Sequence, residues 1–184
     1  MVVTQAGLGL RIGELLALRD VDVDFLRRTV QADTQLAPGA RTRSDPKTPR
    51  SRRIVPLPQV VGDVLAAHMQ TWKPAPDGSL FYTRDLNPYR HDYYGSIIFG
   101  KAVKAAKLPA GTTSHALRHH YASVLLAAGE SVVAVAERLG HENAALVLTT
   151  YGHLMPDRED HTRRAVDDAW SSTADGLTTA SGGD

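Results

Sequence analysis

The chain has 184 residues, of which 42% are hydrophobic and 22% charged, and its formal net charge is +1. This length and composition suit one globular domain with a hydrophobic core. The sequence contains no cysteine, which excludes disulfides, thiolate nucleophiles and cysteine-based zinc sites and agrees with a cytoplasmic location. No apolar run approaches the roughly 20 residues that a membrane-spanning helix needs, so we expect no membrane partner.

In chain order, the first predicted elements are two short helices within residues 1–17, interrupted at Gly9. The pattern then changes to the alternation of apolar and polar residues that is typical of strands. The predicted strands cover residues 21–25, 29–34 and 54–55. Between the last two lies a polar loop, residues 37–50, rich in Pro, Gly, Ser and Arg. These segments predict a small antiparallel three-stranded sheet that carries a basic hairpin.

The remainder of the chain is predicted to be mainly helical. The expected helices cover residues 58–72, 90–107, 114–128, 131–140, 143–151 and 156–170. Thr113 or Ser114 and then Ser131 are suitable N-caps, and Gly129 and Gly140 are suitable helix ends. The fold class is therefore α+β, with one mainly helical domain over residues 1–170. Residues 171–184 are small, polar and glycine-rich, which predicts a disordered tail.

Charge is unevenly distributed along the chain. Residues 41–53 contain six basic side chains and a single acidic one. A basic segment of this kind is typical of a protein that binds the phosphate backbone of nucleic acid. The predicted DNA-binding residues are Arg41, Arg43, Arg50, Arg52 and Arg53.

Polar residues that could take part in catalysis lie at the ends of the predicted elements. They are Arg11 with Glu14, Lys47 in the basic hairpin, His115 with Arg118, and His141 with Tyr151 ten residues later. Each cluster also has an ordinary structural interpretation. Arg11 and Glu14 could be a plain ion pair, Lys47 a solvated lysine, and His115 with Arg118 a chance pattern. His141 could simply lie at a helix C-terminus, and Tyr151 could be a core residue. The interpretation depends on the whole set and its order.

In that order and spacing, the set resembles the tyrosine recombinase family of the phage-integrase type. The strings GLRIGELLALRDVDVD, PKTPRSRRIVPLP, SHALRHHYASVLLAAGES and ERLGHENAALVLTTYGHLMPD carry the resemblance, which runs from about residue 3 to about residue 164. Ala116 departs from the pattern, since the family often has an acidic residue there. Family members also begin further upstream. We therefore expect the front of the catalytic domain to be truncated here and the separate helical DNA-clamping domain to be absent.

The resemblance implies site-specific DNA recombination, of the integration and excision type, by transesterification through a 3′-phosphotyrosyl intermediate. Tyr151 is the implied nucleophile. Arg11 and Arg118 stabilise the negative charge on the non-bridging phosphate oxygens, in place of a metal. Lys47 protonates the 5′-oxygen leaving group. Neither a metal nor another cofactor is implied.

Two histidines complete the implied catalytic set. His115 either accepts the tyrosine proton or donates a hydrogen bond to the phosphate, and His141 donates to a non-bridging oxygen. The implied partner is double-stranded DNA, with a homotetramer on DNA for the full-length protein and a monomer for this chain alone. The helix over residues 156–170 either docks on a neighbouring protomer or packs on its own domain.

Three other functions are alternatives to recombination. A type IB topoisomerase uses a similar pocket, but those enzymes lack the compact LGH…TYGH ending of this chain. A non-catalytic DNA-binding remnant of an integrase remains an alternative, because the expected front end is missing. A phosphatase-like hydrolase is disfavoured, because the sequence has no cysteine nucleophile and no candidate metal cluster.

Overall fold

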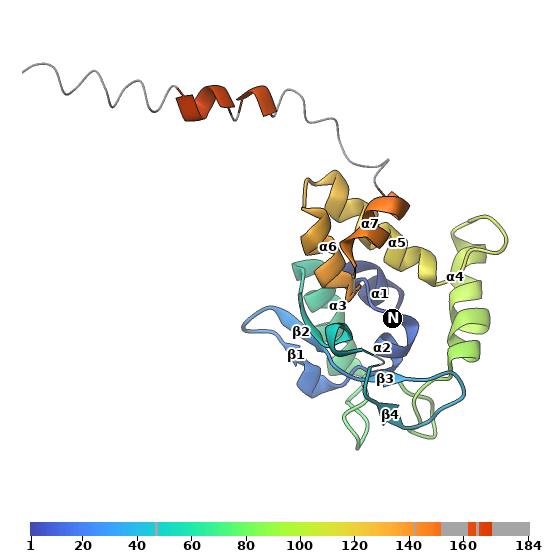
Figure 1. Ribbon diagram of the computed structural model, residues 1–184. Coiled ribbons are helices and arrows are strands. Elements are labelled where there is room, and N and C mark those ends of the chain that lie inside the picture. The colour runs from blue at the N-terminus through green and yellow to red at the C-terminus, as the bar shows by residue number, and fades with distance from the viewer. Residues whose placement is uncertain (47, 142, 152–161, 165, 171–184) are drawn as a thin grey trace, which may run out of the picture. The chain divides into compact units, whose positions relative to one another are not determined.

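The computed structural model describes residues 1–184 except 47, 142, 152–161, 165 and 171–184 (Figure 1). Its contacts divide the chain into two units, Met1–Leu154 and Met155–Asp184. Of the second unit, residues 162–164 and 166–170 are helical. The rest of the helix predicted over 156–170, and the tail predicted over 171–184, lie outside the described residues. No helix in the described part of the chain has both the length and the apolar character needed to cross a bilayer.

The first unit begins with the two predicted helices, α1 (Val2–Leu8) and α2 (Ile12–Ala17). Gly9 ends α1 with φ of 62°, and its N–H donates to the carbonyl of Gln5. A Cβ at this position would lie 2.4 Å from the ring of Tyr121, so both the left-handed backbone and the close approach of this ring require glycine.

The predicted three-stranded sheet is confirmed. Its strands are β1 (Val23–Asp24), β2 (Thr29–Ala32) and β5 (Arg53–Pro56), all antiparallel in the order β1-β2-β5. Val30 is paired with Val55, and both side chains are fully buried. The sheet therefore presents one apolar face to the core.

Two features near this sheet differ from the prediction. The strand expected over 21–25 is shorter, because a 3-10 turn, η1 (Asp20–Asp22), precedes it and leaves Val21 exposed. The Asp22 carboxylate accepts from both the backbone and the guanidinium of Arg19, and these bonds stabilise the turn over the extended form. The loop expected over 37–50 also contains structure: β4 (Arg43–Ser44) pairs with β3 (Gln35–Leu36), and η2 (Pro49–Ser51) precedes β5.

The helix predicted over 58–72 is confirmed as α3 (Gln59–Thr71). The helix predicted over 90–107 has an unexpected pitch, because Tyr93–Phe99 (η3) is a π-helix and is followed by α4 (Gly100–Ala105). Tyr94 and Phe99 are five residues apart and both buried. The i to i+5 spacing of a π-turn places them on the same face, which the α-helical period of 3.6 residues would not do.

The last three helices of this unit begin close to the predicted positions, although the side chain of Ser114 makes no capping hydrogen bond. They are α5 (His115–Ala127), α6 (Val132–Leu139) and α7 (Ala144–Tyr151). Ser131 Oγ accepts from the N–H of Ala134, and Asn143 Oδ1 accepts from the N–H of Ala145. These three helices contact one another, and α5 also contacts α1 (Figure 1).

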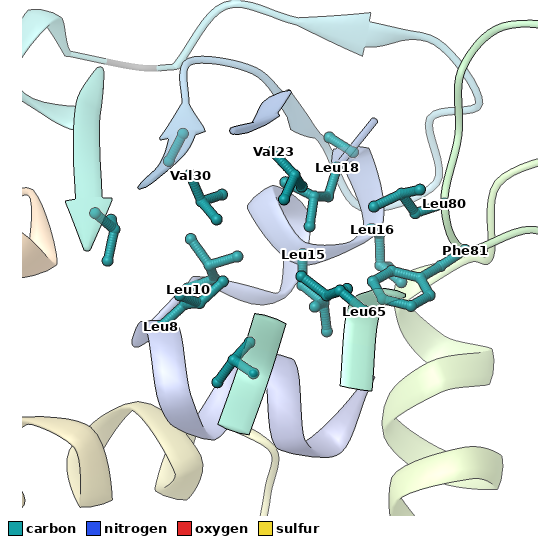
Figure 2. Close-up of a cluster of buried hydrophobic side chains, with 14 of the residues drawn as sticks. Leu8, Leu10, Leu15, Leu16, Leu18, Val23, Val30, Leu65, Leu80 and Phe81 are labelled. Atoms are coloured by element: carbon teal, nitrogen blue, oxygen red, sulfur yellow. The ribbon is translucent and has the colours of Figure 1, made fainter. Parts of the chain in front are cut away.

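Buried side chains form two clusters. The larger one joins α1, α2 and α3 to the strands, and Figure 2 shows several of its members gathered around α2, among them Leu15, Leu16 and Leu65. Complete burial of a leucine contributes about 1.5–3 kcal/mol. The smaller cluster lies within α5, α6 and α7 and includes Tyr121, Leu139 and Tyr151. Five of the predicted catalytic residues lie on the helices of these two clusters or next to them: Arg11, His115, Arg118, His141 and Tyr151.

Candidate active site

Arg11 is the N-cap residue of α2 and is fixed from two directions. Its backbone N–H donates to Glu14 Oε2 (2.8 Å) and its guanidinium donates to Glu14 Oε1 (3.0 Å). The other terminal nitrogen donates to the carbonyl of Gly140 (2.9 Å), at the end of α6. The side chain is 37% exposed. Arg11 is thus held in one orientation at a surface that solvent and a ligand can reach.

Glu14 also binds a second arginine, Arg53 on β5. Two nitrogens of the Arg53 guanidinium donate to the two Glu14 oxygens, each over 2.9 Å, and Nε donates to the carbonyl of Arg138. Both side chains are 4% exposed. Burial alone raises the pKa of Glu14, but the hydrogen bonds and charges of Arg53 and Arg11 outweigh it, so the net pKa is lowered. Glu14 is therefore an ionised carboxylate that links α2 to β5.

Arg118 lies on the first turns of α5 and is almost completely buried. Its two terminal nitrogens donate to the carbonyls of Gly9 (2.7 Å) and Leu139 (2.5 Å). Burial, and then the charge of Arg11, lower the pKa of Arg118 to about 9. This value is still above neutral, so the guanidinium keeps its charge at pH 7. The two arginines therefore bind adjacent carbonyls, those of Leu139 and Gly140.

His141 follows these carbonyls directly, after the left-handed Gly140 that ends α6. A Cβ on Gly140 would lie 3.1 Å from a guanidinium nitrogen of Arg53. Burial, followed by the charges of Arg118, Arg11 and Arg53, lowers the pKa of His141 to about 4. The imidazole is thus neutral at pH 7. Its Nδ1 is buried and has no hydrogen-bond partner among the described residues.

Tyr151 is the last residue of α7, and its side chain is largely buried. Its hydroxyl forms a hydrogen bond with Nδ1 of His119, one of the histidines of α5. Burial raises the pKa of Tyr151, and the charge of Arg118 opposes this rise. The phenol is therefore protonated at neutral pH and needs a proton acceptor before it can act as a nucleophile.

His115 lies one helical turn before His119, and the two rings meet edge to face with their centroids 4.7 Å apart. His115 is exposed, and its pKa is lowered by partial burial and then by the charges of His119, Arg118 and Arg11. Of the two histidines, the described contacts place His119 on the Tyr151 hydroxyl. The sequence interpretation did not include His119, although its position four residues after His115 puts both on one helix face.

The predicted basic residues differ in their environments. Lys47 lies outside the described residues. Arg53 is buried in the ion pair with Glu14, and Arg43 donates to Ala17, Asp77 and Ser79 with a side chain that is 17% exposed. Arg41, Arg50 and Arg52 are exposed. The guanidinium groups of Arg43 and Arg53 are thus bonded to other groups of the protein, and the DNA-binding role of all five arginines stays a prediction.

Two clefts meet at the end of α6. One is lined by Arg11, Glu14, Thr48, His91 and His141 among others. The other has a basic lining that includes Arg50, Arg52, Arg53, Arg138 and His141. Gly140 and His141 line both clefts. An anion in this region would meet fixed guanidinium groups, which match the geometry of a phosphate.

The fold and the order of these residues along it define the class of protein as the tyrosine recombinases. A model of the phage integrase family matches residues 1–158, and the chain belongs to this family. It is 28% identical over 187 residues to a tyrosine recombinase XerC-like protein of Caldanaerobacter subterraneus subsp. tengcongensis, covering 88% of this chain and 47% of that protein. It is 29% identical over 173 residues to the integrase of Staphylococcus phage L54a, covering 86% of this chain and 49% of that protein. The chain thus spans about half the length of these relatives.

Solved structures agree with this assignment. The Tn1549 transposon integrase in complex with circular intermediate DNA matches with a TM-score of 0.74 and 29% identity, covering 91% of this chain and 58% of that one. The catalytic domain of bacteriophage HP1 integrase matches in fold, with a TM-score of 0.56 and 24% identity over 90% of this chain and 78% of that one. The predicted α+β class, mainly helical with a small antiparallel sheet, is confirmed.

Proposed function

We propose that this chain cuts and rejoins double-stranded DNA by transesterification through a 3′-phosphotyrosyl intermediate, as the catalytic part of a site-specific recombinase of the integration and excision type. One observation carries the proposal. Arg11 and Arg118 come from separate helices, yet they donate to the adjacent carbonyls of Gly140 and Leu139, immediately before His141. This arrangement gathers fixed positive charge and a neutral imidazole next to the cleft.

The arginines supply the electrostatic part of the mechanism. Negative charge develops on the non-bridging oxygens as a nucleophile attacks the phosphodiester. Guanidinium groups whose orientation is set beforehand stabilise this charge without reorganising during the reaction. Removal of one such donor costs about 3–4 kcal/mol in comparable sites. The burial of Arg118 strengthens the effect, because its field is less screened by water.

The remaining roles follow from the chemistry of each group. Tyr151 is the proposed nucleophile, and its attack leaves a 3′-phosphotyrosyl bond and a free 5′-hydroxyl. Lys47 is the proposed acid for the 5′-oxygen. His115, exposed beside the site, and His141, neutral and at the cleft, are proposed to donate hydrogen bonds to the phosphate. The ester keeps the energy of the broken bond, so rejoining needs no nucleotide cofactor.

The basic cleft supports DNA as the partner. Arg50, Arg52 and Arg138 line it, and it reaches His141 at the proposed active site. Arg41 extends the exposed basic surface of the same segment. The similar Tn1549 integrase was solved in complex with DNA. We propose that the full-length protein works in the cytoplasm as a tetramer on two duplexes, with residues 1–170 forming the catalytic domain, and that this chain alone is a monomer.

Covalent trapping tests the proposal. The chain is incubated with end-labelled nicked duplexes of randomised sequence, from which the short cleaved fragment diffuses away. We expect a labelled protein–DNA adduct that survives denaturation, and we expect Tyr151→Phe to abolish it while DNA binding is retained. An adduct formed equally by Tyr151→Phe would exclude Tyr151 as the nucleophile. Binding without an adduct in the wild type would indicate a non-catalytic DNA-binding protein instead.

A further inference from the structure

We infer that His119 is the base that takes the phenolic proton of Tyr151 during DNA cleavage. The inference rests on the proposed function and adds to it a catalytic residue outside the set that the sequence indicated. The observation that carries it is direct: the hydroxyl of Tyr151 is hydrogen-bonded to Nδ1 of His119. A general base must lie within hydrogen-bond reach of the proton it removes, and His119 meets this requirement before any substrate is bound.

The surroundings of the pair favour proton transfer over a purely structural bond. The Tyr151 ring is packed among the buried side chains of α5, α6 and α7, which favours the orientation in which its hydroxyl meets His119. His119 is exposed on α5, so a proton that it accepts can pass on to solvent. The bond from the phenol of the buried Tyr151 to the exposed imidazole of His119 is a suitable route for a proton to leave the site.

The neighbouring groups are less suited to the task. Arg118 stays protonated and donates to two carbonyls, so it cannot accept a proton. His115 contacts the ring of His119 edge to face and has no described bond to Tyr151. A base at His119 leaves His115 available as a donor to the phosphate, which agrees with the role proposed for it above.

Cleavage exchanges one ester bond of phosphorus for another and moves two protons. The O–H bond of Tyr151 breaks and its proton moves to Nδ1 of His119, while the phenolic oxygen forms a bond to phosphorus. The bond between phosphorus and the 5′-oxygen breaks, and its electron pair leaves on that oxygen, which takes a proton from the acid proposed at Lys47. In the reverse step the 5′-hydroxyl attacks the phosphotyrosine and gives its proton to the amine proposed at Lys47. The bond between phosphorus and the phenolic oxygen breaks, and the imidazolium of His119 returns its proton to that oxygen.

Four variants of the full chain separate this role from a structural one. His119→Ala removes the imidazole. His119→Asn keeps an oxygen close to the position of Nδ1, which can accept a hydrogen bond but cannot take up a proton at neutral pH. His120→Ala is the matched control, since His120 is the adjacent exposed histidine of the same helix. Tyr151→Phe reports on the proposed function itself. The rate of adduct formation on the nicked duplex pool is measured with and without added imidazole.

We expect both His119 variants to form the adduct at least about 100-fold more slowly than wild type, the usual contribution of a general base. Imidazole should restore His119→Ala in proportion to the free base, because the vacated position is open to solvent. It should not restore His119→Asn, whose side chain fills the position, and His120→Ala should match wild type. If His119 only held Tyr151 by a hydrogen bond, His119→Asn would stay active. Imidazole would then not restore His119→Ala.

Failure of this inference is distinguishable from failure of the proposed function. Wild-type rates in His119→Ala, or full activity in His119→Asn, would overturn the assignment of the base while Tyr151→Phe remains inactive. An adduct in Tyr151→Phe would instead overturn the proposed function, and this inference with it. The hydrogen bond can also be measured by NMR in the absence of DNA. The nitrogen chemical shift of His119 Nδ1 should change in Tyr151→Phe, and an unchanged shift would exclude the hydrogen bond in solution.

Discussion

Replacement of Arg53 by methionine tests whether this residue acts on the fold or on DNA. The basic segment suggested a phosphate contact, whereas the structure places the guanidinium against Glu14. The Glu14 carboxylate accepts four hydrogen bonds, two from Arg53 and two from Arg11. Arg53→Met removes half of them and leaves a buried carboxylate partly unpaired. The carbonyls of Ser51 and Arg138 lose a donor as well.

Arg53→Met is expected to lower the free energy of unfolding by a large amount. Breaking a buried ion pair from one side costs about 3–5 kcal/mol, compared with a total free energy of unfolding of about 5–15 kcal/mol for a typical domain. Urea unfolding, monitored by circular dichroism, should show this loss of stability. With a slope of about 1–3 kcal/mol per molar urea, the midpoint should fall by more than about 1 M.

Arg52→Met is the matched control. Arg52 neighbours Arg53 in the sequence, but its side chain is 56% exposed and its partner Asp45 is 78% exposed. We expect Arg52→Met to change the free energy of unfolding by less than about 1 kcal/mol. Its effect should appear in DNA binding, where one lost phosphate contact reduces the slope of log affinity against log salt by about 0.9. If Arg53→Met showed this reduced slope with wild-type stability, the structural role of Arg53 would be refuted.

Four further outcomes are expected. Because the pKa of Glu14 is lowered in the folded state, its stabilising contribution is present above the unfolded pKa and is lost as pH falls through the folded one. The stability difference between wild type and Glu14→Gln should therefore shrink in urea titrations from neutral to acid pH, and a constant difference would contradict this. Arg11→Lys and Arg118→Lys should lose most adduct formation despite keeping their charge, since an ammonium lacks the bidentate fork; wild-type rates in both would show that charge alone is enough. Gly140→Ala should lower the free energy of unfolding by about 1 kcal/mol or more, because φ is 63° and the added Cβ would press on Arg53; an unchanged urea midpoint would argue against that geometry. Adduct formation should persist in EDTA, since the arginines supply the positive charge, and its loss on chelation would indicate a metal requirement.

Local signals in the sequence were enough to predict most of the helices and their ends. Gly9 and Gly140 were expected to end helices and do so in the left-handed conformation, which glycine adopts without the steric cost of a Cβ. Ser131 and Asn143 were expected to begin helices, and their side chains accept from the first turns. These features depend on neighbours a few residues away, which a single sequence displays.

Some features that alternation and composition do not display were missed or placed only in part. The alternation of Val21, Val23 and Phe25 predicted a longer strand than the one that forms, because the bonds between Asp22 and Arg19 favour a turn. The polar composition of residues 37–50 concealed the short strand β4, whose partner β3 supplies its hydrogen bonds. Periodicity also could not predict a π-turn over Tyr93–Phe99.

The sequence by itself determined the family, the fold class and the order of the candidate catalytic residues, because these are carried by residue type and spacing. The tertiary structure decided how the residues are used. Arg53 and Arg52 are adjacent and chemically identical, yet one is buried against Glu14 and the other is exposed. His119 and His120 are likewise adjacent, yet only the former is bonded to Tyr151 among the described residues. The physical reason is that burial and hydrogen bonding depend on which elements pack together, and those partners lie tens of residues away in the chain.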